Sequence, residues 1–255
     1  MRAEDYEYLY SLEESYWWFT GMRQLSAALL DPECPAGDRL ILDAGCGTGG
    51  TLRWLARYAG AGKVVGVDLS PEAMRFCRGR GPAYLARASV TELPFGDAVF
   101  DLVTSFDVLV QLPGVGADER ALGEMYRVLR PGGVAFVRVA AYEWMRSGHD
   151  EALGTQRRYT LPGLAGKVRR AGFEVLRASY ANSILFPAAV LRRLLLKRVG
   201  LTDRGSDVKP LPAGFGWLNR ALDAALRGEA LLLKHTKLNL PAGLSVTCVA
   251  KKPES

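Results

Sequence analysis

The stretch LILDAGCGTGG at residues 40–50 decides the fold of this 255-residue chain. It opens with a short apolar run that is typical of a buried strand, and it passes directly into closely spaced glycines. A helical pattern follows from about Thr51 to Tyr58. Glycines at a strand-to-helix turn let a ligand approach the backbone, and the first amides of the helix point toward that ligand. The stretch therefore predicts a strand, a ligand-binding turn and a helix.

Strand and helix patterns alternate along the chain from this stretch. Ser70-Pro71-Glu72 is typical of a helix start, and further helices are predicted at 118–129 and 161–171. Repeated strand–helix units favour a mainly parallel sheet with helices on both faces. The predicted strands cover residues 39–43, 63–68, 83–88, 100–105, 134–140, 173–179 and 244–251.

The same pattern divides the chain into parts. Residues 1–38 are aromatic, predict one or two helices and are expected to form an N-terminal lid. Residues 39–180 form the predicted core. Residues 181–243 are a predicted cap inserted before the last strand, which lies in residues 244–255 with the tail.

Composition limits the classes of protein. Hydrophobic residues make up 49% and charged residues 24%, as in a globular protein, and the net charge of +6 permits an acidic partner without requiring one. The four cysteines are scattered and only two histidines occur, so no metal site or disulfide framework is expected. The start lacks an apolar signal segment, and no long uncharged apolar run predicts a membrane span. We therefore expect a cytoplasmic protein.

The glycine turn alone does not identify its ligand. Read as Gly45-x-Gly47-x-x-Gly50, it also matches the dinucleotide fingerprint. The turn therefore indicates a cofactor that contains a nucleoside, but it does not show which one. Asp68 ends the second predicted strand, where a carboxylate can accept hydrogen bonds from ribose hydroxyls. The alternatives are a tight turn without ligand and, for Asp68, an acid at the start of the next helix.

Four ordered motifs identify a family resemblance. DAGCGTG at 43–49 and VDLS at 67–70 resemble the first two motifs of class I S-adenosylmethionine-dependent methyltransferases, of the type 11, ubiquinone-biosynthesis-like kind. ELPFGD at 92–97 and EMYRVLRPGG at 124–133 continue the resemblance and are not expected in a dinucleotide dehydrogenase. The resemblance implies S-adenosylmethionine as cofactor and a Rossmann-like, seven-stranded, mostly parallel sheet whose last strand is antiparallel.

The resemblance also implies roles in cofactor binding. The glycines pass beneath the methionine and ribose, Asp68 holds the ribose, Leu69 packs on the adenine, and Ser89 stands where the family commonly has Asp. Gln111 stands where members often have His, so a histidine base is not inferred there. The implied cofactor residues are Asp43, Gly45, Cys46, Gly47, Gly49, Asp68, Leu69, Ser89, Val90, Phe106 and Arg23, the last for the methionine carboxylate.

Acceptor residues are expected outside the sheet core. The aromatic run at 16–19 would form a lid, and the segment after the fifth strand would hold a base or an acidic acceptor group. A packed helix and a solvated loop are the plainer alternatives. The candidate catalytic residues are His149, Tyr159 and Asp107; the candidate substrate residues are Tyr16, Trp17, Trp18, Tyr142, Arg157 and Arg158.

Residues 184–199 of the insertion predict a basic, partly amphipathic helix. On a helical projection Arg192, Arg193 and Lys197 share one side, and leucines lie largely opposite. Such a helix can contact an anionic membrane surface or cover a lipid-like acceptor. The favoured alternative is a cap helix whose basic face lies in water.

Together these features predict an enzyme that moves a methyl group to O, N or C of a small, bulky or hydrophobic acceptor by in-line displacement. Alignment and exclusion of water supply much of such catalysis, so no catalytic dyad is required. Two alternatives remain. Nucleic-acid methylation is disfavoured because residues 105–108 read SFDV rather than Asn/Asp-Pro-Pro-aromatic. A non-catalytic S-adenosylmethionine-binding protein is the other.

Overall fold

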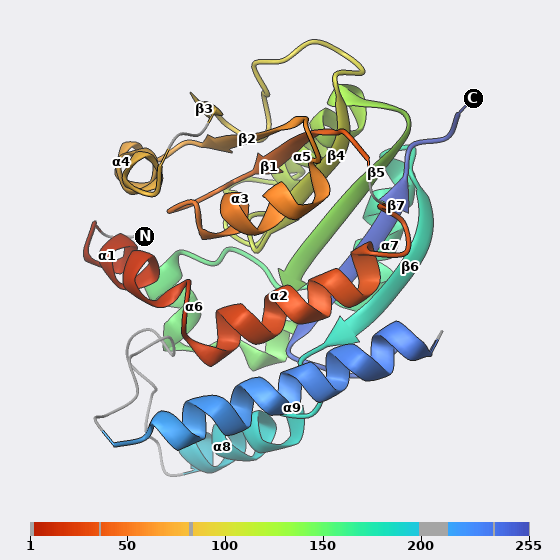
Figure 1. The fold of residues 1–255 in the computed structure, drawn as a ribbon. Helices are drawn as coiled ribbons and strands as arrows, with labels where there is room; N and C mark the ends of the chain where they lie inside the picture. Colours follow the sequence, from red (N-terminus) through yellow and green to blue (C-terminus); the bar gives the residue numbers. More distant parts are fainter. Residues whose placement is uncertain (1–2, 36, 82–83, 199–213, 237, 255) are drawn as a thin grey trace.

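The computed structural model describes residues 3–35, 37–81, 84–198, 214–236 and 238–254 (Figure 1). Within these ranges a seven-stranded sheet has the order β3-β2-β1-β4-β5-β7-β6. The strands are β1 Leu40–Ala44, β2 Lys63–Asp68, β3 Tyr84–Arg87, β4 Phe100–Phe106, β5 Leu129–Ala140, β6 Glu174–Ala181 and β7 Ser245–Lys251.

Strands β1 to β5 pair in parallel, and β7 is antiparallel to both β5 and β6. This topology confirms the predicted fold class. Strand order reverses between β1 and β4, and in such sheets ligands bind beyond the carboxyl ends of the strands at the reversal. The glycine turn follows β1, and Asp107 follows β4, so both lie at this crevice.

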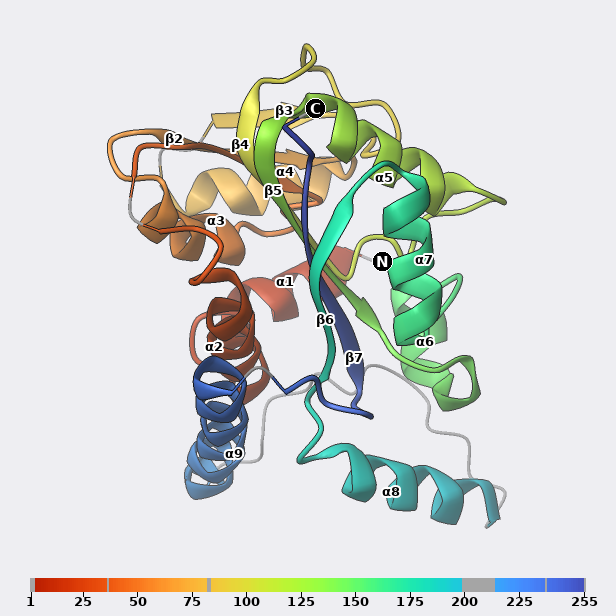
Figure 2. The same ribbon diagram turned by 90° about the vertical axis from the view of Figure 1, so that its right-hand side faces the viewer.

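Side chains alternate between two cores along the central strands. Ile41 packs with α2 Trp17–Leu30 and α9 Gly216–His235, whereas Leu42 packs with α5 Ala117–Val128 and α7 Leu161–Arg170. Successive side chains of a strand point to opposite faces, so adjacent apolar residues in β1 serve both cores. Figure 2 shows the two helical layers on either side of the edge-on sheet.

Several predicted boundaries move. The helix expected at 51–58 is α3 Gly50–Leu55 followed by a 3-10 turn, η1 Ala56–Tyr58. β5 begins at Leu129 and includes the expected turn at 131–133, where the Gly132 amide donates to the Lys252 carbonyl at 2.8 Å. The segment after β5, expected as a loop, contains η2 Glu143–Met145 and α6 Gly148–Leu153. The start of β5 depends on the tertiary hydrogen bond of Gly132, whereas α6 begins at a local capping box between Ser147 and Asp150 that sequence reasoning missed.

The N-terminal segment forms α1 Ala3–Leu12 and α2, while the insertion contributes α8 Phe186–Arg198 and α9. α9 runs along α2, and a Cβ on Gly21 would lie 2.4 Å from Leu226 Cδ1. Thr20 Oγ1 also donates to Asp223 Oδ1 at 2.6 Å. The N-terminal segment and the insertion, expected to cover the site together, therefore share one helical layer through α2 and α9. No helix in the described part of the chain is long and apolar enough to cross a membrane.

Candidate cofactor and acceptor site

A cavity of about 860 Å³ opens at the carboxyl ends of the central strands. Its walls come from two groups of segments, which we call the cofactor side and the acceptor side. The cofactor side is lined by Glu13, Gly45, Cys46, Gly47, Asp68, Leu69, Ser89 and Val90. The acceptor side is lined by Trp17, Trp18, Phe106, Asp107, Arg138, Met145, Arg158, Leu185, Arg192 and Arg193, among others.

The glycine turn is fixed to the neighbouring strand. The amides of Gly45 and Cys46 both donate to the Val67 carbonyl, at 2.8 and 2.9 Å. Gly45 has φ +92, and a Cβ there would lie 2.2 Å from Val108 Cγ2. A Cβ on Gly47 would meet nothing within 4 Å, so this residue leaves open space beside the cavity. The turn thus presents bare backbone where a ligand can approach closely.

Asp68 faces the same part of the cavity. Its Oδ2 accepts from the Gly47 amide and its Oδ1 from the Ser70 amide, both at 2.9 Å. Ser70 Oγ accepts from the Ala73 amide at 3.2 Å and caps α4 Pro71–Gly79. Since Ser70 is the cap, the alternative role of Asp68 as a helix-capping acid is not needed. The carboxylate is instead held at the cavity wall by two backbone donors.

Ser89 and Val90 line the cavity after β3. Ser89 Oγ accepts from the Thr91 amide at 3.2 Å and lies 2.8 Å from Thr91 Oγ1. These contacts orient the hydroxyl that stands where the family commonly has a carboxylate. Leu69 is 63% exposed and also lines the wall, which suits a side chain that packs on a flat ring.

Two predicted cofactor residues lie outside the cavity lining. Asp43 is fully buried beneath the turn, where it accepts from Thr51 Oγ1 and, at 2.8 Å, from Thr104 Oγ1. Burial raises the pKa of Asp43 to about 6. Gly49 is the N-cap of α3 and faces Cys77, whose Sγ would lie 2.6 Å from a Cβ. Both residues support the turn from behind the cavity wall. The prediction that they contact the cofactor directly therefore does not agree with their positions.

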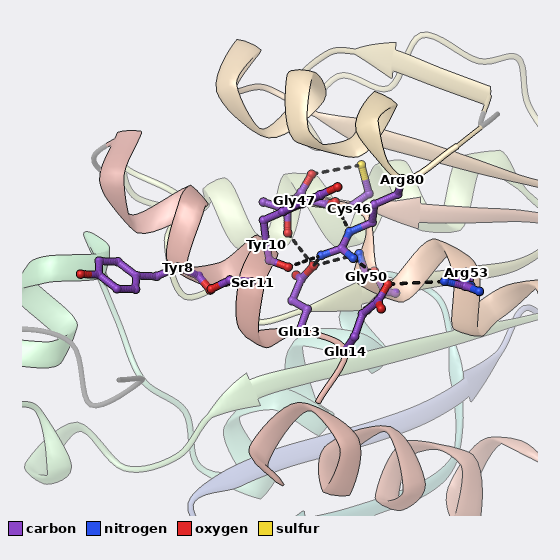
Figure 3. Close-up of polar contacts among 12 residues, drawn as sticks. Tyr8, Tyr10, Ser11, Glu13, Glu14, Cys46, Gly47, Gly50, Arg53 and Arg80 are labelled. Atoms are coloured by element: carbon purple, nitrogen blue, oxygen red, sulfur yellow. Dashed lines mark hydrogen bonds and ion pairs between the residues drawn. The ribbon is translucent and has the colours of Figure 1, made fainter. Parts of the chain in front are cut away.

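Glu13 was missed by sequence reasoning and joins α1 to the glycine turn (Figure 3). Its Oε2 accepts from Thr48 Oγ1 at 2.5 Å, from the Gly50 amide at 3.0 Å and from Arg80 Nη2 at 2.8 Å. Burial raises the pKa of the Glu13 carboxyl, although hydrogen bonds from Thr48 and the charge of Arg80 oppose this shift. No local motif marks Glu13, because its partners lie far along the chain.

Arg23, predicted to bind the methionine carboxylate, lines the cavity next to this network. Its Nη1 donates to the Glu13 carbonyl at 2.7 Å, and burial lowers the pKa of the guanidinium. Arg23 therefore also fixes the turn between α1 and α2. This structural contact was not expected from the sequence.

The floor of the acceptor side is an ion pair between Asp107 and Arg138. Arg138 Nη2 lies 2.7 Å from Asp107 Oδ2, and its guanidinium lies 5.0 Å from the ring centres of both Trp18 and Phe106. Asp107 has φ +58, a strained conformation for a residue with a side chain. Cation–π contacts on both rings hold the pair in place. Arg138 is a second functional candidate that the sequence did not reveal.

Tyr159 and Arg157 do not fit their predicted roles. The Tyr159 side chain is buried in the core, where its hydroxyl donates to Asp118 Oδ2 at 2.7 Å, and burial raises its pKa. Arg157 Nη1 lies 2.9 Å from Asp118 Oδ1. Both residues therefore surround a buried carboxylate outside the main cavity. A tyrosine so held is a structural residue rather than a base.

The other residues after β5 divide between cavity and core. Arg158 lines the cavity and binds Asp150 through Nε at 2.7 Å and Nη2 at 3.0 Å. Tyr142 lies outside the cavity lining and stacks on Tyr180, with ring centres 5.1 Å apart. The side chain of His149 lies outside the described part of the structure. Three catalytic side chains were predicted. The structure describes two of them, Asp107 and Tyr159, and of these two Asp107 lines the cavity.

Helix α8 closes the acceptor side. Leu185, Ala188, Ala189, Arg192 and Arg193 line the cavity at helical spacing, with Arg192 at an exposed position. The expected split into basic and apolar sides is present, but the apolar side faces outward: Leu191, Leu194 and Leu195 are 58%, 57% and 53% exposed. The favoured interpretation of a cap with its basic face in water is therefore wrong for Arg193, which is half-buried at the cavity.

Comparison with known proteins defines the class. A family model for the methyltransferase domain matches residues 42–137. The sterol 24-C-methyltransferase of Eremothecium gossypii is 36% identical over 124 residues, covering 46% of this chain and 31% of that protein. The malonyl-[acyl-carrier protein] O-methyltransferase of Pectobacterium atrosepticum is 39% identical over 130 residues, covering 48% and 47%. The chain thus spans less than half the length of these relatives.

Solved structures share the fold over more of the chain. Phosphoethanolamine N-methyltransferase 2 of Haemonchus contortus, in complex with S-adenosyl-L-methionine, has a TM-score of 0.57 at 20% identity, covering 89% of this chain and 52% of that one. The [4+2]-cyclase SpnF has a TM-score of 0.58 at 21% identity, covering 91% and 82%. A shared fold therefore occurs with different reactions.

Residues 42–137 match the methyltransferase domain, as the motifs indicated.

Proposed function

We propose that the chain transfers the methyl group of S-adenosylmethionine to a small, largely apolar acceptor in the cytoplasm. The observation that carries this proposal is one continuous cavity. Its cofactor side holds the bare glycine turn and Asp68, and its acceptor side holds Trp17, Trp18 and α8. A volume of about 860 Å³ lies within the usual range of about 300–1,000 Å³ for ligand sites.

The residues present fit the cofactor. Gly47 leaves open space where the backbone meets the cavity, and the Asp68 carboxylate stands beside it with lone pairs suited to ribose hydroxyls. When bound, S-adenosylmethionine supplies a methyl group on a positively charged sulfur. The chain contributes orientation of the acceptor and exclusion of water, which are the main requirements of in-line displacement.

If the acceptor atom carries a proton, a base must remove it. Among the residues that the structure describes, Asp107 is our candidate for this base. Arg138 holds its carboxylate in place and also balances its negative charge. The ion pair therefore positions the Asp107 carboxylate at the cavity wall, where it can accept a proton from a bound acceptor.

An apolar acceptor is supported by the walls and by the relatives. Trp17, Trp18, Phe106, Met145 and Leu185 give the acceptor side a mostly apolar surface. The names of matched relatives include sterol 24-C-methyltransferase and demethylmenaquinone methyltransferase. Lipid-like acceptors are therefore the first to test.

We also propose that residues 184–199 contact an anionic membrane surface. The outward leucines at 191, 194 and 195 support it, because exposed apolar side chains on one helix favour insertion between lipid headgroups. Sedimentation with anionic vesicles should pellet the wild type, and Leu194→Glu should reduce pelleting. Equal recovery with anionic and zwitterionic vesicles would contradict the anionic preference.

Calorimetric titration with S-adenosylhomocysteine tests the central proposal, with NAD as the negative ligand. We expect micromolar binding of the first alone, weakened about a hundredfold in Asp68→Asn through loss of charged hydrogen bonds. Asp97→Asn, an exposed acid outside the cavity, is the matched control. Absence of binding would refute the proposal.

Labelled S-adenosylmethionine in cell extract then separates the alternatives. Label in the lipid-soluble fraction supports an apolar acceptor, and label in nucleic acid supports the nucleic-acid alternative. Cofactor binding without transfer to any fraction favours a non-catalytic binding protein.

A further inference from the structure

The contacts between α1 and the glycine turn have a role that the proposed function does not explain. The turn itself has no side-chain cap for α3, because Gly49 occupies the N-cap position. The Glu13 carboxylate takes that place from a distant part of the chain, accepting from Thr48 Oγ1 and from the Gly50 amide. An acid at this position also interacts favourably with the helix dipole.

Arg80 connects the same carboxylate to α4. Its Nε donates to the Thr48 carbonyl at 2.8 Å, its Nη2 to the Tyr10 carbonyl at 2.9 Å, and its guanidinium lies 4.2 Å from the Tyr10 ring centre. The Arg80 and Glu13 side chains are only 10% and 12% exposed. This pair is therefore shielded from solvent, so salt screens it less than a surface ion pair, and removing either partner leaves a buried charge unpaired.

Helix α1 is held against the cofactor side by these contacts. The Tyr10 ring packs on Phe76 of α4 with centres 5.2 Å apart, and Leu9 and Glu13 line the cavity. Figure 3 shows Glu13 and Arg80 meeting between α1 and the turn. A cofactor on the turn would lie beside α1.

We propose that Glu13 is a positioning residue of the cofactor site: it fixes the glycine turn and holds α1 closed beside bound S-adenosylmethionine, so that cofactor release requires the Glu13–Arg80 contacts to open. This inference rests on the proposed function, because it assigns a role at the same cofactor site. It predicts that Glu13 controls the lifetime of the bound cofactor more than the chemistry of transfer.

The matched pair Glu13 and Glu14 provides the test. Glu14 has the same charge and is adjacent in the chain; its 58% exposed side chain also pairs with Arg80, at 2.9 Å, but it does not accept from Thr48 or Gly50 as Glu13 does. We expect Glu13→Gln to weaken S-adenosylhomocysteine binding about threefold and Glu13→Ala about tenfold, with release faster by similar factors. Glu13→Gln keeps an acceptor oxygen for the turn, which explains the smaller effect. Glu14→Gln weakens an exposed ion pair with Arg80 and leaves the hydrogen bonds of the turn in place, so affinity and release should stay within about twofold of the wild type.

Release is measured by stopped-flow displacement, using the fluorescence of Trp17 and Trp18 in the cavity wall. Hydrogen exchange of residues 45–50 without ligand is measured in parallel, and faster exchange is expected in Glu13→Ala alone. Thermal unfolding of each variant excludes a folding defect as the cause.

The inference would be overturned if Glu13→Ala had the same affinity, release rate and amide exchange as the wild type. Failure of the wild type to bind S-adenosylhomocysteine would instead overturn the proposed function. The amide-exchange comparison needs no ligand, so it would still decide whether Glu13 holds the turn.

Discussion

The cofactor side and the acceptor side of the cavity are built in different ways. The cofactor side consists mainly of the short segments that follow β1, β2 and β3, and backbone amides hold its turn and its Asp68. The acceptor side takes side chains from α2, the ends of β4 and β5, α6 and α8. Ion pairs and aromatic contacts between distant residues hold it, such as Asp107 with Arg138 and Trp18.

This difference explains why the cofactor is easier to infer than the acceptor. Local backbone geometry needs particular residues at fixed spacing, so it leaves a motif. Side-chain contacts between segments satisfy the same physical needs with many residue combinations and leave none. The following predictions separate the two sides, and they begin with the largest expected effect.

Gly45→Ala should abolish the cofactor side. The new Cβ would lie 2.2 Å from Val108 Cγ2 at φ +92, so we expect a loss of about 3–4 kcal/mol in unfolding free energy. S-adenosylhomocysteine affinity should fall at least about a hundredfold, because the turn must shift. Calorimetry and denaturant unfolding measure both.

Gly114→Ala is the control for this change. Gly114 has φ +87, yet a Cβ there would meet nothing within 4 Å. It should cost about 1 kcal/mol of stability and leave affinity unchanged. Equal effects of the two substitutions would show that backbone strain, not contact with Val108, explains the glycine at 45.

Asp43→Asn should change how stability depends on pH. Burial raises the Asp43 pKa from 3.8 to about 6, so the folded state holds this proton more tightly than the unfolded state. Stability contributed by Asp43 is thus present below about pH 4 and lost as pH rises toward 6, by about 2–3 kcal/mol.

Asn does not titrate, so the unfolding free energy of the wild type minus that of the variant should fall across this window. Urea unfolding at pH 4, 5, 6 and 7 measures the difference. A constant difference would mean that Asp43 ionises normally beneath the turn.

Tyr159→Phe should affect the acceptor-side scaffold and leave the cofactor side unchanged. The substitution removes the 2.7 Å hydrogen bond to buried Asp118, which should cost about 1–2 kcal/mol of stability. S-adenosylhomocysteine affinity should stay within about twofold. Once an acceptor is known, kcat should also persist; a loss of kcat at unchanged stability would restore Tyr159 as a base.

Ser89→Asp should produce the smallest change and improve the cofactor side. A carboxylate accepts a hydrogen bond from an amino group more strongly than a hydroxyl does, so affinity should rise about threefold. Ser89→Ala should bind slightly more weakly than the wild type. Calorimetry on the three proteins ranks them, and the reverse order would place the adenine elsewhere.

The sequence predicted most of the sheet, because period-two apolar runs and glycine or proline boundaries are local properties. It placed α8 correctly but not its orientation, since Arg193 lies at the cavity while Leu194 is exposed. Residues near the β5 end were harder still. Arg157, Arg158 and Tyr159 are adjacent in the chain, yet only Arg158 lines the main cavity.

By itself the sequence determined the fold class and the glycine turn, and it predicted the role of Asp68 and the cofactor, because each depends on residue types at short, fixed spacing. The tertiary structure alone decided that Asp43 supports the turn from below, that Tyr159 is a core residue, and that Glu13 caps α3. These roles depend on contacts between segments far apart in the chain, and burial and hydrogen-bond geometry are set only when those segments pack together.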